Sequence, residues 1–379
     1  MTDLLYDADE EALRDSVRAL LTAYAPWQRT LAAVDGEDRY DLELWRRLVD
    51  QTGITGLAVP TEYEGAGAGF REVAVVLEEL GRTVAPVPFL GTVVATRALL
   101  ACGEHTLLRQ VATAECEVTL AVGFATAPDR TPAATAPTST TRCDPVRVGS
   151  GPTLSGRVSG VVDAVPEGLL LVPAGEGLYV VEAADPAVRL TPVVSLDATR
   201  PLVDIEFTGA PARPVATGVA AAEAVTAALT AGAALLASEQ VGLAQWCLDT
   251  TVAYVRQRHQ FGRPVGSFQA VKHRLADLWV ELTEARAVAR YAADRLGADD
   301  AEASLAAALA QAYCGPMAVR AAEVCVQLHG GLGFTWEHPA HLYLKRAKSS
   351  AIAFGTADRH RAALARMVDL PAPTVEQRH

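Results

Sequence analysis

Hydrophobic residues recur at steps of three and four positions in the first and last parts of this chain, but not in the middle. The segments ALRDSVRALLTAYA (12–25) and ELWRRLVDQTG (43–53) show the first pattern, which is typical of helices with one buried face. Between residues 116 and 214 the chain has short β-branched runs such as VTLAV, GLLLVPA and PLVDIEF, separated by Gly, Pro and Asp. These runs predict strands, so the pattern divides the chain into helical, β and helical parts.

The third part carries the most regular pattern. Apolar residues alternate in steps of four and three over three heptads, at Val271, Leu275, Leu278, Leu282, Ala285, Ala289 and Ala292. Such a stripe lines either the core of a helix bundle or a subunit interface. We therefore expect a mainly α protein with a β middle domain, divided into an N-terminal helical domain (1–115), a small β domain (116–214) and a C-terminal four-helix bundle (215–379).

Composition narrows the class of protein. The 379 residues are 50% hydrophobic and carry a net charge of −12 without any block of Lys and Arg, so binding to nucleic acid or to anionic membrane surfaces is not expected. The acidic N-terminus lacks the apolar run of a signal peptide. The longest apolar stretch, residues 224–237, is shorter than the ~20 residues of a membrane span. These features predict a cytoplasmic protein.

Cysteines are scattered, and neither a C-x-x-C pair nor an H-E-x-x-H motif occurs, so we expect reduced thiols and no metal site. Two further segments are assigned to turns or loops. GAGAGF (65–70) superficially resembles a phosphate loop but lacks the strand before it. ATAPDRTPAATAPTSTT (125–141) has low complexity. The six cysteines are Cys102, Cys116, Cys143, Cys247, Cys314 and Cys325.

Two segments contain residues suited to binding a phosphorylated cofactor. In RQRHQFGRPVGSFQAVKHRLADL (256–278), Arg258 stands at a predicted helix end beside Phe261, and a guanidinium can donate two parallel hydrogen bonds to a diphosphate. In QLHGGLGFTWEHPAHLYLKR (327–346), Gly330 and Gly331 would let the backbone approach a ligand closely. The alternative is that these glycines only terminate a helix.

Together with GLAVPTEYEGAG (56–67) and LEELGRTVAPVPF (77–89), these segments resemble the acyl-CoA dehydrogenase family over nearly the whole chain. The resemblance implies the fold expected above, with FAD at a subunit interface. It implies that one group of residues contacts the FAD of the neighbouring subunit. Arg258 and Phe261 would contact its diphosphate and adenosine, with Phe268, Gln269, Gln327, Gly330 and Gly331 nearby, and Thr356 is also assigned to the cofactor.

The chain departs from the family pattern where the catalytic base belongs. In the family a glutamate removes the α-proton of an acyl thioester while the β-hydrogen leaves as hydride to the flavin. Its commonest position precedes a Gly-Thr pair, and here Phe354 precedes Gly355 and Thr356. A minority of the family carries it on an earlier bundle helix, where this chain has Gly232. The nearest acid on that helix is Glu239, a weak candidate for a relocated base and otherwise a paired polar group within the bundle or its interface.

The motifs that hold the flavin ring in the family are also missing. A Thr-Glu-Pro loop would fall within the low-complexity segment, and a later Trp-x-Thr/Ser stretch would fall near SGVVD (159–163). There, Gly160 and Val162 stand in place of the tryptophan and the hydroxyl. The chain thus retains the motif that serves a neighbour's FAD and has lost those that hold its own flavin ring.

Three hypotheses follow. The first is a base-lacking subunit that completes an FAD site for a homologous, base-carrying partner, as in bacterial heteromers that act on steroid side-chain CoA thioesters. The second is a self-sufficient homo-oligomeric flavoenzyme acting on an unusual thioester of CoA or a carrier protein. The third is a flavin-free binding or assembly subunit. An electron-transfer flavoprotein would be the usual electron acceptor of the family.

Overall fold

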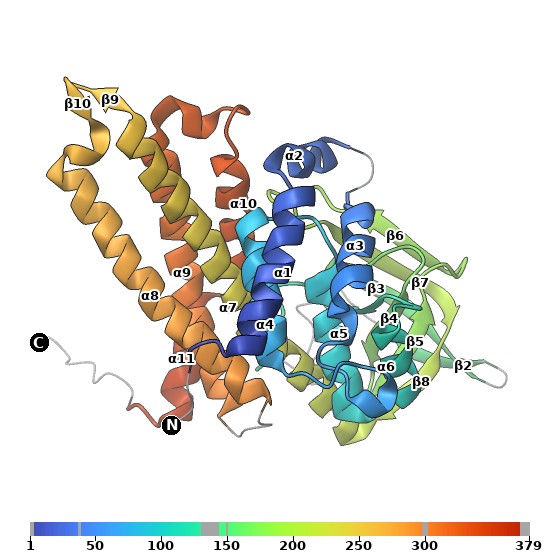
Figure 1. Cartoon of the computed structure of the whole chain (residues 1–379). Coiled ribbons are helices and arrows are strands. Elements are labelled where there is room, and N and C mark those ends of the chain that lie inside the picture. The colour runs from blue at the N-terminus through green and yellow to red at the C-terminus, as the bar shows by residue number, and fades with distance from the viewer. Residues whose placement is uncertain (1–3, 37–38, 130–143, 149–150, 298–301, 372–379) are drawn as a thin grey trace, which may run out of the picture.

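The computed structural model describes residues 4–36, 39–129, 144–148, 151–297 and 302–371. The helices of the N-terminal part lie between a helix bundle on one side and a β region on the other (Figure 1). The predicted fold class, mainly α with a β middle region, is confirmed. Cys143 and most of the low-complexity segment lie outside the described residues.

In the part of the chain that the structure describes, six helices precede the β region and five follow it. Typical capping residues begin and end these helices. Asp7 forms a capping box with Glu10 at the start of the first helix, and Gly53 ends the third helix in the left-handed conformation. The helices are α1 (Ala8–Tyr24), α2 (Trp27–Asp35), α3 (Leu42–Thr52), α4 (Phe70–Thr83), α5 (Phe89–Cys102), α6 (His105–Ala112), α7 (Gly218–Gln257), α8 (Gln269–Gly297), α9 (Ala303–His329), α10 (Ala340–Ser350) and α11 (Ala357–Met367), with short 3₁₀ turns η1 (Ile54–Gly56), η2 (Thr61–Tyr63), η3 (Val265–Ser267) and η4 (Gly330–Phe334).

The β region consists of two four-stranded sheets with the strand orders β1-β4-β5-β8 and β2-β3-β7-β6. All neighbours pair antiparallel except β1 and β4, and a separate hairpin, β9-β10, follows α7. The strands are β1 (Val118–Leu120), β2 (Asp144–Val148), β3 (Gly151–Val162), β4 (Leu169–Ala174), β5 (Gly177–Glu182), β6 (Val188–Pro192), β7 (Leu202–Pro211), β8 (Arg213–Thr217), β9 (His259–Gln260) and β10 (Arg263–Pro264).

The bundle is built on the 40-residue helix α7, which packs against α8, α9 and α10. The heptad stripe faces the bundle core, since its residues from Leu278 to Ala292 are buried, whereas Val271 and Leu275 are half-buried near the hairpin. The alternative of a stripe that only lines a subunit interface is therefore excluded. Helix α7 is also long and apolar enough to cross a membrane, but 67% of its most apolar window is buried inside the fold, as in core helices generally.

Glycines allow α4 and α7 to cross at very short range. A Cβ on Gly81 would lie 2.1 Å from the carbonyl oxygen of Glu239, and one on Gly242 would lie 1.8 Å from that of Glu78. The predicted GAGAGF turn is confirmed between η2 and α4. Its Gly65 is required for packing, because a Cβ there would lie 2.0 Å from the carbonyl oxygen of Val59.

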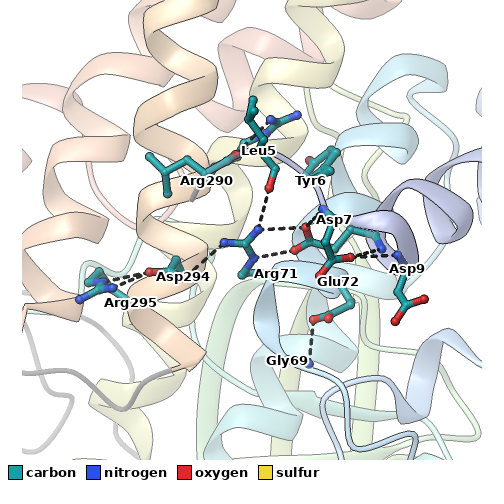
Figure 2. A network of polar contacts seen from close by, with 12 residues as sticks. Leu5, Tyr6, Asp7, Asp9, Gly69, Arg71, Glu72, Arg290, Asp294 and Arg295 are labelled. Atoms are coloured by element: carbon teal, nitrogen blue, oxygen red, sulfur yellow. Dashed lines mark hydrogen bonds and ion pairs between the residues drawn. The ribbon is translucent and has the colours of Figure 1, made fainter. Parts of the chain in front are cut away.

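A polar network fastens the N-terminal segment to α4 and α8 (Figure 2). Arg71 donates to both oxygens of the buried Glu10, at 2.6 and 2.9 Å, and to the carbonyl of Leu5 at 3.0 Å. The guanidinium of Arg290 lies over the ring of Tyr6, 3.6 Å from its centroid. The segment is thereby tied to the bundle through charged groups rather than through apolar packing alone.

Candidate functional site

The two positions at which the sequence resemblance leads us to expect a base, 354 and 232, lie against each other in this structure. Phe354 is 2% exposed, and a Cβ on Gly232 would come within 2.6 Å of atoms Cε1 and Cζ of its ring. Helix α7 supplies Gly232, and the break between α10 and α11 supplies Phe354. An apolar ring thus occupies the space that a carboxylate at either position would need.

The break in the last bundle helix sets the direction of the Phe354 ring. Phe354 has a positive φ of 52°, and Gly355 follows with 105°, conformations that turn the chain between the end of α10 at Ser350 and the start of α11 at Ala357. The Phe354 N–H donates to the carbonyl of Phe124 at 2.8 Å, and its own carbonyl accepts from Nε2 of His360 at 3.0 Å. Burial lowers the pKa of His360. Thr356 caps α11 through a 3.4 Å hydrogen bond from the N–H of Arg359.

Phe124 separates Phe354 from the β region. The two rings meet edge to face with their centroids 5.5 Å apart, a favourable arrangement of aromatic quadrupoles. The guanidinium of Arg200 lies over the Phe124 ring, 5.4 Å from its centroid. The base position is therefore enclosed by aromatic rings.

Glu239 belongs to a buried network of charges that joins α7, α10 and the loop before β7. Its two oxygens accept from Arg200 and from Arg346, the latter at 3.0 Å, and Arg346 also pairs with Asp197 at 3.0 Å. Glu239, Arg200 and Arg346 are each at most 5% exposed. Burial alone would raise the pKa of Glu239, but the charges of Arg200 and Arg346 outweigh it and hold the pKa below its ordinary value.

This pairing argues against Glu239 as the relocated base. A general base needs an oxygen that faces the substrate and a pKa near the working pH. Glu239 instead offers a carboxylate whose two oxygens are both bound by guanidinium groups, so the structure supports the reading of a paired group within the fold.

Asp163 is a second buried acid, and its protonation differs from that of Glu239. Its Oδ2 accepts from the N–H of Gly91 at 2.8 Å, and the Tyr40 hydroxyl lies 3.5 Å from Oδ1. Burial raises the pKa of Asp163 to about 6, against the opposing charge of Arg200 and the hydrogen bond from Gly91. The folded chain therefore holds a proton between pH ~4 and pH ~6 that the unfolded chain has released.

We expect Asp163→Asn to change the pH dependence of stability. The wild-type chain should lose about 3 kcal/mol as pH rises from 4 to above 6, because the pKa in the folded state, about 6, exceeds the ordinary value of 3.8. An asparagine stays neutral, can accept the Gly91 hydrogen bond and tolerates the positive φ of 56°. Chemical denaturation should show the variant equal to wild type at pH 4 and more stable at pH 7.

Asp204→Asn is the matched control. The pKa of Asp204 is lowered, since its hydrogen bonds to Arg157 and to the N–H of Gly160 outweigh the effect of burial. That variant should be less stable than wild type at pH 7, the opposite sign. A pH-independent difference between Asp163→Asn and wild type would contradict the assignment.

A cavity of about 710 Å³ lies beside the enclosed base position. Phe124 and Ile352 line it, and so does Gly160, which has a positive φ of 67° and open space where a Cβ would stand. Lys348 and Arg359 are its charged lining residues, and no Asp, Glu or His lines it within the described part of the chain. The cavity offers room for a ring system, and its described lining contains no carboxylate.

The residues predicted to bind FAD gather mainly at the other end of the bundle. Arg258 caps the C-terminus of α7, and Phe261, 90% exposed, stands on the β9-β10 turn that projects from the bundle (Figure 1). Phe268 packs edge to face against Phe261 and carries the Arg263 guanidinium 3.9 Å from its centroid. Gln269 begins α8 and is exposed. Residues 256–276 contain five Lys or Arg and no acid, which suits an anionic ligand.

The second glycine-containing segment lies beside the first. The ring of Tyr254, one turn before Arg258, stacks on the ring of His329 with the centroids 4.4 Å apart, so the ends of α7 and α9 are neighbours. Gln327 is exposed in the last turn of α9. Thr356 is not part of this group, because it precedes α11, which lies at the opposite end of the bundle from β9 and β10 (Figure 1).

The family models divide the chain as its geometry does. The N-terminal domain model of acyl-CoA dehydrogenases matches residues 7–114, and the C-terminal domain model matches residues 222–368. Acyl-CoA dehydrogenase IpdE2 of Mycolicibacterium smegmatis is 35% identical over 347 residues, covering 92% of this chain and 94% of the relative. This chain belongs to the acyl-CoA dehydrogenase family. IpdE2 of Mycobacterium tuberculosis is 36% identical, over 90% of this chain and 92% of the relative.

Solved acyl-CoA dehydrogenase structures show the same fold. A variant of the Tcur3481-Tcur3483 steroid ACAD has a TM-score of 0.82 and 31% identity, covering 95% of this chain and 98% of that chain. The ChsE4-ChsE5 complex of Mycobacterium tuberculosis has a TM-score of 0.84 and 28% identity, covering 98% of this chain and the whole of that chain. The family consists of oxidoreductases that use FAD.

The bundle end exposes backbone at its glycines, beside Arg258. Gly330 ends α9 with a φ of 60°, so it does terminate a helix, as the alternative interpretation of the sequence expected. Gly331 has no such role, and a Cβ on it, on Gly330 or on Gly262 would meet nothing within 4 Å. These positions leave backbone accessible to a ligand, and Arg258 has no ion pair within the described residues.

Sequence reasoning missed the charged residues around the enclosed base position. Arg200, Arg346 and Asp163 come from three separate parts of the chain and share no motif or spacing. The only signal available was their presence in otherwise apolar surroundings, as with Asp163 after the strand residues Val161 and Val162. Their roles depend on contacts between segments more than 30 residues apart.

Proposed function

We propose that this chain is a subunit of a heteromeric acyl-CoA dehydrogenase, in which it completes the FAD site of a homologous partner that carries the base and the flavin pocket. One observation carries the proposal: Phe354 and Gly232 fill the base position, and no acid lines the neighbouring cavity within the described residues. The partner's FAD would accept the hydride, and Arg258 and the Gly330–Gly331 turn of this chain would hold its diphosphate.

The distance between the two ends of the bundle supports binding in trans. Gly232 and Arg258 are 26 residues apart on α7, and at 1.5 Å per residue this separates them by about 39 Å. That distance exceeds the length of an extended FAD molecule. Arg258 is therefore suited to a cofactor whose flavin ring lies in another subunit.

The relatives support a heteromer and a class of substrate. ChsE4 and ChsE5 were solved as a complex, and the Tcur3481-Tcur3483 protein is described as a steroid ACAD. By analogy we propose a cytoplasmic complex whose substrate is a CoA thioester with a steroid-derived acyl chain. The analogy extends to the class of substrate and not to the individual acyl group, because the shape of the partner's pocket would select that group.

A second candidate is a self-sufficient flavoenzyme. The cavity of about 710 Å³ beside Gly160 favours it, since this volume is typical of small-molecule sites. The pairing of Glu239 weakens it, because that residue was its candidate base. The third candidate, a flavin-free assembly subunit, has only the exposed Phe261 and its neighbours in its favour.

A visible spectrum separates these candidates. The chain should be purified alone and after co-expression with a homologue that retains the glutamate, and flavin should be measured at 450 nm. The proposal expects a colourless lone chain and a yellow complex. Flavin on the lone chain would support the self-sufficient enzyme, and colourless protein in both cases would support the assembly subunit.

Arg258→Ala should weaken retention of FAD by the complex roughly tenfold to a hundredfold, because one charge-assisted hydrogen bond to phosphate contributes on the order of 1.5–3 kcal/mol. The folding of the lone chain should be unaffected, since Arg258 is exposed. Arg256→Ala, two residues earlier on α7, is the control and should have a smaller effect. FAD affinity in the Arg258→Ala complex equal to wild type would rule out this assignment.

A further inference from the structure

Three aromatic rings lie in contact with one another along a row beside the proposed diphosphate-binding end of the bundle, one pair stacked and the other tilted. His329 lies between Tyr254, at 4.4 Å and 25° between ring planes, and His338, at 4.2 Å and 33°. The rings come from α7, from the last residue of α9 and from the segment before α10. His329 is 3% exposed, whereas Tyr254 and His338 are half-buried, so the central ring is covered by the outer two.

The stack joins the two backbone segments that would hold the diphosphate. The carbonyl of Tyr254 accepts the hydrogen bond from the N–H of Arg258 at 2.9 Å, so the position of the Tyr254 ring is coupled to the end of α7. His329 immediately precedes Gly330 and is fastened by a 2.7 Å hydrogen bond from Nδ1 to the carbonyl of Cys325. A shift of either ring would alter the distance between Arg258 and the glycine turn.

The His329 ring makes its closest aromatic contacts with Tyr254 and His338. Its Nδ1 donates within its own helix, and its buried Nε2 has no hydrogen-bond partner within the described residues. A buried polar atom without a partner is unfavourable. The ring is therefore placed here for its flat faces, and not because Nε2 bonds a neighbouring segment of this chain.

We infer that His329 is a positioning residue, which through its stacking with Tyr254 and His338 sets the spacing between Arg258 and the Gly330–Gly331 turn for the diphosphate of FAD. This inference rests on the proposed function. The free energy that one aromatic pair contributes is modest. We therefore expect the loss of one pair to weaken the affinity for FAD roughly three- to tenfold.

The test compares FAD affinity and thermal stability in the co-expressed complex. His329→Ala and Tyr254→Leu should each weaken FAD binding roughly three- to tenfold. His329→Phe keeps a flat ring without the unpaired nitrogen and should restore affinity to near the wild-type value. If it binds FAD as weakly as His329→Ala, the nitrogens and not the stacked faces matter, and the inference is overturned.

The chain contains a matched control for loss of stability alone. Tyr63 and His105 stack at 4.5 Å and 25° in the N-terminal part, almost the geometry of Tyr254 and His329. Tyr63→Leu should lower the melting temperature as Tyr254→Leu does, yet leave FAD affinity unchanged. Equal weakening by both variants would show a general effect of destabilisation and would refute the positioning role.

The Arg258→Ala complex, measured in the same assay, distinguishes failure of the proposed function from failure of the positioning role alone. If Arg258→Ala leaves FAD affinity unchanged, the proposed function fails, and the positioning role fails with it. If Arg258→Ala weakens binding while His329→Ala and Tyr254→Leu do not, only the positioning role fails. Should His329→Ala not fold, Tyr254→Leu and His329→Phe still decide the outcome.

Discussion

Purified without a partner, this chain should turn over acyl-CoA thioesters ~10²–10⁴-fold more slowly than a family member that retains its glutamate, the factor that a general base typically contributes. The reason is structural: the Phe354 ring occupies the expected base position against Gly232, and Glu239 is bound by Arg200 and Arg346. No titratable acid lines the adjacent cavity within the described residues.

The measurement is steady-state dehydrogenation with an artificial electron acceptor, across short-chain, long-chain and steroid-derived CoA thioesters. Enzyme reconstituted with added FAD should be included, so that the absence of cofactor is not the cause of low activity. The co-expressed complex is the positive control. Turnover by the homogeneous lone chain at the rate of an ordinary family member would contradict the subunit role.

Phe354→Glu should not create an active enzyme, and it should cost the chain about 3–5 kcal/mol of stability at neutral pH. The change removes a buried ring and places a carboxylate against Gly232 and the Phe124 ring, in a niche that is now filled by apolar atoms. Phe124 lines the cavity and Phe354 does not, so we expect the acid to be poorly placed for any substrate bound there.

Two further variants show whether the loss of stability comes from the carboxylate or from the change in packing. Phe354→Leu keeps the site apolar and should be destabilised less, by the cost of a smaller side chain. Gly232→Ala should be strongly destabilised on its own, because its Cβ would lie 2.6 Å from the Phe354 ring, and combining it with Phe354→Leu should recover part of the loss. Activity from Phe354→Glu alone would mean that only the base had been lost, and the subunit role would have to be abandoned.

The contact between Gly232 and Phe354 couples the choice of residue at the two positions. A side chain at 232 cannot coexist with the ring at 354 in this packing, because the two occupy the same space. A large apolar residue at one position therefore requires the smallest residue at the other. Residues 232 and 354 therefore pack as a complementary pair, as expected for a subunit that does not carry out the proton abstraction itself.

Local patterns in the sequence were sufficient to predict the order of helical and β parts and the core stripe on α8. Side chains at three- and four-residue steps share one face of a helix whatever lies around it, so the burial of Leu278, Leu282 and Ala285 could be expected from their spacing. The absence of a glutamate at 354 and at 232 is likewise a property of the sequence, read through the family motifs. These features depend on neighbours along the chain.

The tertiary structure alone decided what the remaining groups do. Glu239 meets Arg200 and Arg346, 39 and 107 residues away, and its low pKa follows from those charges. The proton held by Asp163 comes from burial beneath segments distant in sequence. Local propensity carries no information about such pairings, because the free energy of a buried charge is set by the groups that folding brings within a few ångströms of it.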